Sequence, residues 1–509
     1  MLAKVKSCSL TGLAVSDVEI EVDAAGGLPA WDIVGLPDTA VKESKERVRT
    51  AIKNSGFDFP PRRIVVNLAP ADIKKEGPSF DLPIALAILA ATNQINILNL
   101  NSFVTVGELG LDGRLRKVNG VLPISLEKKT ADLKLIVPFE NGLEGSIGGT
   151  RTYSFKSLKE VVEFLQSPEQ YLPVECPNLA ELFSEDAVLN YDFKNVKAQG
   201  EAKRALEIAA AGNHNVIMVG SPGSGKTMLA RCLAGILPSL TYQECLDITK
   251  IYSVAGLLPG SQPIISQRPF RSPHHSASQA SVIGGGRIPA PGEVSLSNYG
   301  VLFMDELPEF NKDVLEALRQ PLEEGIVTIS RVAAQLSYPA NFLLIAAMNP
   351  CPCGFYGDLS KECTCTSFQV QKYRNKVSGP LLDRIDIQLE IPRLAFNELQ
   401  AEGEAESSIS IRERVERARL IQRQRFLKSG YLTNSEMQTQ DLKRYCRLDK
   451  EGKLLLKEAF NRLALSARAH DRILKVARTI ADLEEEEFIL ASHLAEAIQY
   501  RALDRKVWD

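Results

Sequence analysis

The sequence lacks any apolar run near the roughly 20 residues that a membrane-spanning helix needs, and aromatic residues make up only 6% of it. The N-terminal stretch MLAKVKSCSLTGLAV is interrupted by Ser, Cys, Thr and Gly, and acidic residues follow it, so it makes a poor signal peptide. These absences predict a cytoplasmic protein with no membrane partner.

A large charge of either sign is also lacking. The 60 basic and 63 acidic side chains leave a net charge of −3, so the whole molecule has no positive field to attract nucleic acid. Any nucleic-acid binding must therefore come from a local patch. Four of the nine cysteines lie between 351 and 365, which in a cytoplasmic chain indicates reduced thiols with a possible metal cluster rather than disulfides.

The length of 509 residues predicts about three domains, because single cores stop growing near roughly 250–300 residues. Residues 1–165 alternate β-rich runs with helical stretches and predict a compact α/β domain. A linker rich in Pro and acidic residues follows at 166–191. Residues 192–395 again alternate helices with apolar runs typical of buried parallel strands, and residues 396–509 show helical periodicity. The overall class is therefore α/β with a C-terminal helical domain.

The strongest local signal is GSPGSGKT, which follows the apolar run NVIMV and precedes the helical stretch MLARCLAGIL. This is the P-loop pattern, in which backbone N–H groups surround phosphate oxygens. Lys226 would neutralise the β- and γ-phosphates of ATP, and Thr227 would ligate Mg²⁺. The predicted nucleotide-binding residues are Gly220, Ser221, Pro222, Gly223, Ser224, Gly225, Lys226, Thr227 and Met228.

Two later apolar runs end in polar residues that suit hydrolysis. VLFM leads into Asp305, which would hold the Mg²⁺ shell, and Glu306, which would polarise the attacking water. FLLIAAM leads into Asn349, whose amide would orient that water. Alone, each pattern also fits a surface turn, but the upstream P-loop favours the catalytic interpretation.

Cys351, Cys353, Cys363 and Cys365 form two C-x-C pairs. Four thiolates this close suit a tetrahedral Zn²⁺ site, although C-x-C is tighter than the usual C-x₂-C. Free thiols and an iron–sulfur cluster remain the alternatives. We predict Zn²⁺ in an insertion at 351–365, where it would brace the ATP sensor Asn349 or a DNA-contacting flap.

Two segments could contact DNA. Residues 268–287 carry three arginines, two histidines and a glycine run, which suits a loop on a phosphate backbone. The two histidines also fit a structural turn after Pro273. The second segment is a pair of strand-like runs at 327–339. The candidate DNA-binding residues are Arg271, His274, His275, Arg287 and Arg331. The acidic run at 482–488 is typical of a solvated helix face or turn.

With these motifs in order, residues 192–509 resemble the magnesium-chelatase-like branch of AAA+ ATPases, and nearly the whole chain resembles the ComM/YifB family within it. The resemblance is carried by DFKNVKAQG, RPFRSPHHSAS, GGGRIPAPGEVSLSNYGVLFMDELPEF, AAMNPCPCG and LLDRIDI followed by SARAHDR. It implies that Gln199 lies near the adenine, Arg384 is a finger for a neighbour's γ-phosphate and Arg468 is a second-sensor arginine. Active sites would then form between subunits of a homohexameric ring.

The N-terminal domain resembles the proteolytic domain of the Lon family through KKEGPSFDLPIALAILAA and GELGLDGRLRKVNGVLPIS. Ser79 falls at the position of the nucleophilic serine, but Leu122 stands where a Ser/Lys mechanism needs its lysine. Lys128 and Lys129 are near in sequence, and Ser79 also fits a helix N-cap. The resemblance with this departure implies a binding or ring-assembly role rather than peptidase activity.

The resemblance implies an ATP- and Mg²⁺-dependent hexameric motor on single-stranded or branched DNA. It would promote branch migration, a helicase activity, during recombination of imported DNA, with recombination proteins as possible partners. One alternative is a chelatase-type motor acting on a protein or a porphyrin-enzyme partner, and another is a Lon-like protease. The fused N-terminal domain and the cysteine insertion disfavour the first alternative, and Leu122 disfavours the second.

Overall fold

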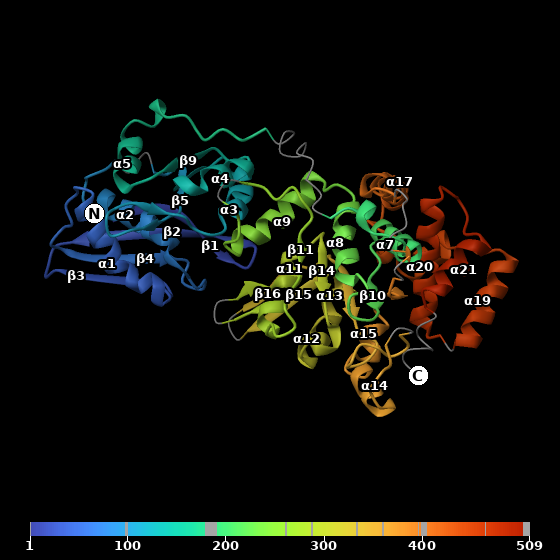
Figure 1. The fold of residues 1–509 in the computed structure, drawn as a ribbon. Coiled ribbons are helices and arrows are strands. Elements are labelled where there is room, and N and C mark those ends of the chain that lie inside the picture. The colour runs from blue at the N-terminus through green and yellow to red at the C-terminus, as the bar shows by residue number, and fades with distance from the viewer. Residues whose placement is uncertain are drawn as a thin grey trace. The chain divides into compact units, whose positions relative to one another are not determined.

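The computed structural model describes residues 2–96, 100–178, 191–259, 262–286, 289–331, 334–358, 361–394, 397–398, 405–463 and 465–501. Its contacts divide the chain into two compact units (Figure 1). The first unit comprises Met1–Glu185, Tyr242–Ser266 and Ser330–Tyr338, and the second comprises Asp186–Thr241, Gln267–Ile329 and Pro339–Asp509. The units interleave along the chain, and the linear boundaries expected at 165, 191 and 395 stay predictions.

The first unit is built on a seven-stranded mixed sheet in the order β3-β4-β2-β1-β5-β8-β9. Its strands are β1 (Leu2–Thr11), β2 (Ala14–Ala25), β3 (Ala30–Val34), β4 (Arg63–Ala69), β5 (Phe103–Thr105), β8 (Lys134–Pro138) and β9 (Thr152–Phe155). β1 and β2 form a long antiparallel hairpin, whereas β5, β8 and β9 run parallel. Alternate residues of β1 are buried, so one face of this strand packs on the core. The N-terminal stretch is thus a strand of the sheet.

Helices cover this sheet. They are α1 (Thr39–Asn54), α2 (Asp81–Ala91), α3 (Val121–Lys128), α4 (Gly142–Ile147) and α5 (Leu158–Gln166). Every residue of α2 is buried, which explains its continuous apolar sequence. A further helix, α9 (Tyr242–Val254), follows the P-loop helix in the chain yet packs against α3. The expected α/β fold is confirmed for this part of the chain.

The second unit is built on a five-stranded sheet in the order β11-β14-β17-β10-β18. Its strands are β10 (Val216–Val219), β11 (Phe270–Arg271), β14 (Val301–Met304), β17 (Leu343–Met348) and β18 (Ile387–Glu390). All of their pairings are parallel, as the apolar runs predict. Because the strands are parallel, their carboxyl ends meet at one edge, where ligands bind in open α/β sheets.

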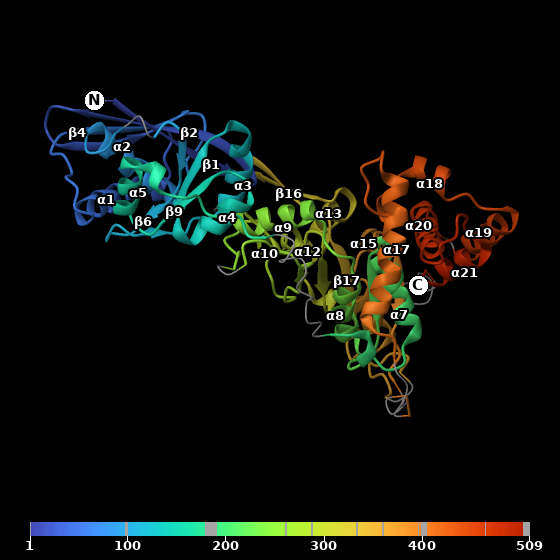
Figure 2. The same ribbon diagram turned by 90° about the horizontal axis from the view of Figure 1, so that it is seen from above.

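Helices of the second unit pack on this sheet and on one another. α7 (Gly200–Gly212) and α8 (Lys226–Ile236) pack together, and the long helix α17 (Ser408–Phe426) lies along both, as Figure 2 shows. α17 also contacts α20 (Ala467–Leu483), which packs against α21 (Ala491–Gln499). α18 (Thr439–Tyr445) contacts α20, and α19 (Lys450–Leu463) contacts α21. The helical C-terminal part is therefore confirmed.

The acidic run at 482–488 begins at the end of α20. Asp482 is buried and pairs with Arg425 and Arg478, whereas residues 484–488 form an exposed turn. The expectation of a solvated turn thus holds for all but the first residues of the run. None of the helices in the described ranges is both long enough and apolar enough to span a bilayer.

Candidate functional site

The phosphate loop lies at the carboxyl end of β10 and leads directly into α8. Gly223 and Gly225 both have a positive φ, of 79° and 90°, a conformation that glycine adopts without steric cost. Gly225 is the N-cap of α8, so the helix begins at Lys226 with its positive dipole end facing the loop. This arrangement matches an anion-binding turn at a helix N-terminus.

Lys226 is buried within this loop. Its Nζ donates to the carbonyl oxygens of Gly220 at 2.6 Å and Ser221 at 3.0 Å and lies 3.4 Å from Oδ1 of Asn349. Desolvation lowers the pKa of Lys226, and the negative charge of Asp305 partly offsets this. The ammonium group therefore stands in the loop, between residues that follow β10 and β17.

Thr227 and Asp305 meet at the same edge of the sheet. Thr227 Oγ1 donates to Asp305 Oδ2 at 3.0 Å, although 78 positions separate the two residues in the chain. A hydroxyl and a carboxylate side by side are the protein ligands that Mg²⁺ takes in P-loop sites. The structure thus brings together the two residues that the sequence assigned to Mg²⁺.

Glu306 has a left-handed backbone, with φ of 52°, a conformation that costs energy in a residue other than glycine. Its exposed carboxylate lies 3.2 Å from Nδ1 of His275. The ring of His275 in turn stacks on that of His274, with centroids 4.1 Å apart. The segment predicted to contact DNA therefore touches the predicted catalytic glutamate.

Gln199 also touches the phosphate loop. It precedes α7 in a left-handed conformation, and its Nε2 donates to the carbonyl oxygen of Ser224 at 2.8 Å. Pro222, Gly223 and Met228 are exposed around the loop. All the predicted nucleotide-binding residues thus gather in one place.

The two candidate arginines lie apart in sequence but share one carboxylate. Arg384 is buried, and its guanidinium pairs with Glu323 in α13 (Arg319–Glu324) and donates to the carbonyl of Pro380. Its Nε has no hydrogen-bond partner among the described residues. Arg468 is exposed, with a nitrogen 3.7 Å from the same Glu323 oxygen. The hydrogen bond from Arg384 lowers the pKa of Glu323, which keeps this carboxylate charged.

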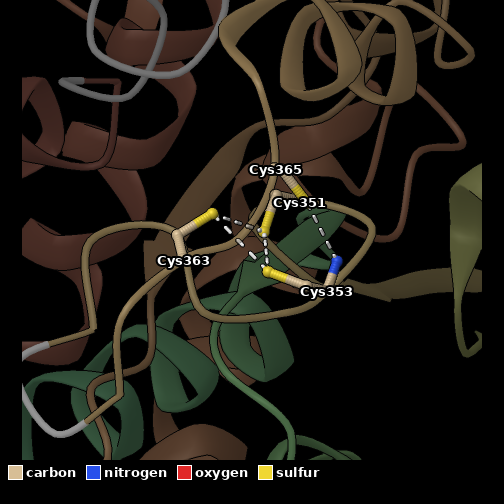
Figure 3. Close-up of side chains that lie close together, drawn as sticks. All are labelled: Cys351, Cys353, Cys363 and Cys365. Carbon is tan, nitrogen blue, oxygen red and sulfur yellow. Dashed lines mark hydrogen bonds between the residues drawn. The ribbon is translucent and has the colours of Figure 1, made fainter.

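The four cysteines of the insertion converge (Figure 3). All four sulfurs lie within 4.8 Å of one another. Those of Cys351 and Cys353 are 3.3 Å apart, and Cys363 lies 3.7 and 3.5 Å from them. The backbone N–H of Cys353 donates to Sγ of Cys365 at 3.4 Å. Cys351 is buried and the others are half-buried. Four thiols at these distances fit the ligand set of a tetrahedral Zn²⁺ site.

The other candidate DNA-binding residues are placed less uniformly. Arg271 lies in β11 and forms a two-pronged ion pair with Glu293, with nitrogen–oxygen distances of 2.6 and 2.8 Å. Arg331 ends β15 (Ile326–Arg331), which pairs with β16 (Ala334–Pro339), so the two expected strand-like runs are strands that form a hairpin. Arg287 and the side chain of Arg331 lie outside the described residues.

The Lon-like serine has no lysine in its predicted place. Leu122 is fully buried and its backbone N–H donates to Glu144 Oε1 at 3.0 Å. Lys128 is buried and its Nζ pairs with Asp17. Ser79 lies in the turn Pro78–Phe80, and Phe80 is the N-cap of α2. The alternative that Ser79 caps this helix is therefore wrong.

Two features of the structure were not predicted from the sequence. Glu323, which joins the two arginines, stands in QPLEEG, which carries no motif. Glu144 is buried and accepts hydrogen bonds from Leu122 N, the hydroxyl of Ser253 and Asn141 Nδ2. This carboxylate links α9 to α3 within the first unit. The contacts of Glu323 with Arg384 and of Glu144 with Ser253 join segments that are far apart in the chain, so no local signal marks them.

Comparisons with known proteins agree along the whole chain. Family models for magnesium chelatase subunit ChlI match residues 192–399 and 20–141, and one for the ChlI C-terminal region matches residues 405–501. The chain is 45% identical to competence protein ComM of Haemophilus influenzae, over 99% of this chain and 98% of that protein. It is 44% identical to YifB of Salmonella typhimurium, over 99% and 98%.

More distant similarity extends to the chelatase itself. The magnesium-chelatase 38 kDa subunit of Rhodobacter capsulatus is 24% identical over 31% of this chain and 50% of its own length. The family is one of ATPases that use ATP and Mg²⁺ and typically oligomerise. The parallel sheet, its phosphate loop and the full-length relatives together show that this chain belongs to the ComM/YifB family of magnesium-chelatase-like AAA+ ATPases.

Proposed function

We propose that this protein is a homohexameric motor that hydrolyses ATP to promote branch migration of DNA during recombination of imported strands. The observation that carries the ATPase part is the meeting of Lys226, Thr227, Asp305 and Asn349 at one sheet edge. The name of its relative in Haemophilus influenzae, a competence protein, supports the DNA part.

Each residue at the sheet edge has a role in this proposal. Lys226 neutralises the transferred phosphate, and Mg²⁺ is held by Thr227 and Asp305. Glu306 accepts a proton from the attacking water. Asn349, whose amide lies beside the Lys226 ammonium, orients that water. Gln199 lines the side of the site that faces the adenine of ATP.

Arg384 and Arg468 complete the site of a neighbouring subunit. Their convergence on Glu323 supports this role, since two guanidinium groups that share one carboxylate suit the charge of one γ-phosphate. The Nε of Arg384 has no hydrogen-bond partner among the described residues, which leaves one donor of this guanidinium unused. A single chain should then hydrolyse ATP poorly.

DNA contact is proposed for residues 268–286 and for the hairpin of β15 and β16. The 3.2 Å contact between Nδ1 of His275 and the Glu306 carboxylate supports a coupling of this segment to hydrolysis, because a shift of the histidine would break that contact. In this proposal, DNA that binds the His274–His275 turn moves His275 away from Glu306. The Glu306 carboxylate can then accept a proton from the attacking water. Arg271 serves instead to hold the segment through Glu293.

We also propose that Zn²⁺ occupies the four-cysteine cluster. The convergence of four sulfurs from residues 351–365 supports it. Zn²⁺ would supply a structural cross-link there, because a site closed by four thiolates leaves no open position for catalysis. Elemental analysis of purified protein tests this, with about one zinc per chain expected.

The experiment for the motor is ATP hydrolysis by the full chain with no DNA, single-stranded DNA or branched DNA. We expect DNA to raise the rate, and Lys226→Ala to abolish it in every condition. His275→Ala should lower the ratio of the DNA-stimulated rate to the basal rate, because it removes the contact between this segment and Glu306. A rate that no DNA form changes would overturn the DNA part of the proposal and leave the ATPase standing.

A further inference from the structure

The segment from Cys351 to Cys365, here called the cysteine loop, is in direct contact with the phosphate loop. Gly354 has φ of 86°, and a Cβ built on it would lie 2.6 Å from both Cγ and Cδ of Pro222. Real Cβ atoms do not approach other heavy atoms this closely, so the Gly354 backbone packs on the proline ring with no room for a side chain. Pro222 is the third residue of GSPGSGKT.

A second connection runs through the residues just before Cys351. Asn349 lies 3.4 Å from the Lys226 ammonium, and its backbone N–H bonds the hydroxyl of buried Tyr373. The carbonyl of Pro350 accepts from Arg374 Nε at 3.2 Å. The chain on both sides of buried Cys351 therefore touches the nucleotide site, at Lys226 and at Pro222.

The described part of the cysteine loop has no regular secondary structure, and cation–π contacts of Lys361 with Phe355 and of Arg374 with Tyr356 add to the contacts above. Residues 351–358 and 361–365 contain no helix or strand, and Pro352, Tyr356 and Gly357 are exposed. A loop without regular structure keeps much conformational freedom unless a cross-link removes it. Four ligands on one metal ion would provide that cross-link.

We propose that the metal bound by the four cysteines braces the phosphate loop. By fixing the Cys351–Cys365 loop, it holds Gly354 against Pro222 and Asn349 against Lys226, in the arrangement that binds the triphosphate. This inference rests on the zinc centre proposed above. It makes the cysteine cluster a requirement for nucleotide binding, although no cysteine touches the nucleotide loop's lysine or threonine in the described contacts.

The test uses full-length protein and two readouts, zinc per chain and the dissociation constant of a fluorescent N-methylanthraniloyl ATP. Cys363→Ser removes one ligand, and Cys176→Ser, at an exposed cysteine, is its control. Gly354→Ala leaves all ligands but pushes on Pro222. Gly357→Ala is its matched control, because φ is also positive, at 80°, and no heavy atom lies within 4 Å of the added Cβ.

We expect Cys363→Ser to lose zinc and to weaken ATP binding about tenfold, which corresponds to about 1.4 kcal/mol. Gly354→Ala should keep zinc and weaken ATP binding to a similar degree, while both controls match the parent. If Cys363→Ser fails to fold, chelation of the parent protein replaces it, with the same loss of affinity expected.

Loss of zinc with unchanged ATP affinity would overturn the brace and leave the metal site standing. A parent protein without zinc would overturn the metal site and the brace with it. Gly354→Ala with parental affinity would also overturn the brace, because the contact with Pro222 would then have no effect on the nucleotide loop.

Discussion

In the second unit, the parallel strands β10, β14 and β17 lead into Gly220, Asp305 and Asn349. In the first unit, the parallel strands β5 and β8 lead into Val106 and Phe139. Both units are α/β, and both bring the carboxyl ends of parallel strands to one edge. The residue directly after each of these strands is a glycine, a carboxylate or an amide in the second unit, and an apolar residue in the first. The sheet thus supplies a place for chemistry, and the residues after its strands decide whether chemistry occurs.

Glu306→Gln should have the largest effect, because it removes the proposed base and keeps the size of the side chain. We expect ATP hydrolysis to fall by at least about 100-fold, while binding of N-methylanthraniloyl ATP is retained. Glu309→Gln is the matched control, since Glu309 pairs with Lys376 on the surface. Hydrolysis within threefold of the parent rate in Glu306→Gln would remove the catalytic contrast between the two units.

Mixing two inactive variants tests whether the site of the second unit is shared between neighbouring subunits. Lys226→Ala lacks the phosphate lysine and Arg384→Ala lacks the proposed finger, so each alone should hydrolyse ATP very slowly. In a random equimolar ring, about a quarter of the interfaces join an intact loop to an intact arginine. We expect the mixture to recover a comparable fraction of the parent rate. No recovery in mixed oligomers would show that both residues act within one subunit.

Replacing Glu144 tests whether this buried carboxylate stabilises the first unit through packing rather than taking part in catalysis. Glu144→Ala leaves the donors of Leu122, Ser253 and Asn141 without their acceptor. An unsatisfied buried donor costs about 1–3 kcal/mol, so we expect a lower urea midpoint for unfolding of the full chain. Glu140→Ala, on the exposed surface of the same region, is the control. An unchanged midpoint would mean that water satisfies these donors.

The sequence predicted which residues of the second unit meet at the sheet edge, because the signals for them are local. The glycine turn, the strand before it and the helix after it are contiguous in the chain, and each acidic or amide residue directly follows an apolar run. The convergence of Cys351, Cys353, Cys363 and Cys365 followed from their spacing in the same way.

Contacts between distant segments could not be predicted. Glu323 meets Arg384 and Arg468 only because α13, the end of α15 (Gly379–Leu382) and the start of α20 pack together. Likewise, nothing in the sequence of α9 indicates that Ser253 bonds Glu144, which lies 109 positions away in the chain. Such pairs depend on tertiary packing, whose pattern is spread over many residues.

Ser79→Ala should have the smallest effect. The serine lies in a turn beside buried α2, but Leu122 stands where its lysine would be, and buried Lys128 is paired with Asp17. We expect the variant to hydrolyse ATP at the parent rate, and we expect neither protein to cleave casein. The unfolding midpoint should also match the parent, since replacing a half-exposed serine changes stability by roughly 0.5 kcal/mol or less. Casein cleavage by the parent that Ser79→Ala abolishes would instead give the first unit a catalytic site. The contrast between the two sheets would then lie in which chemistry each performs.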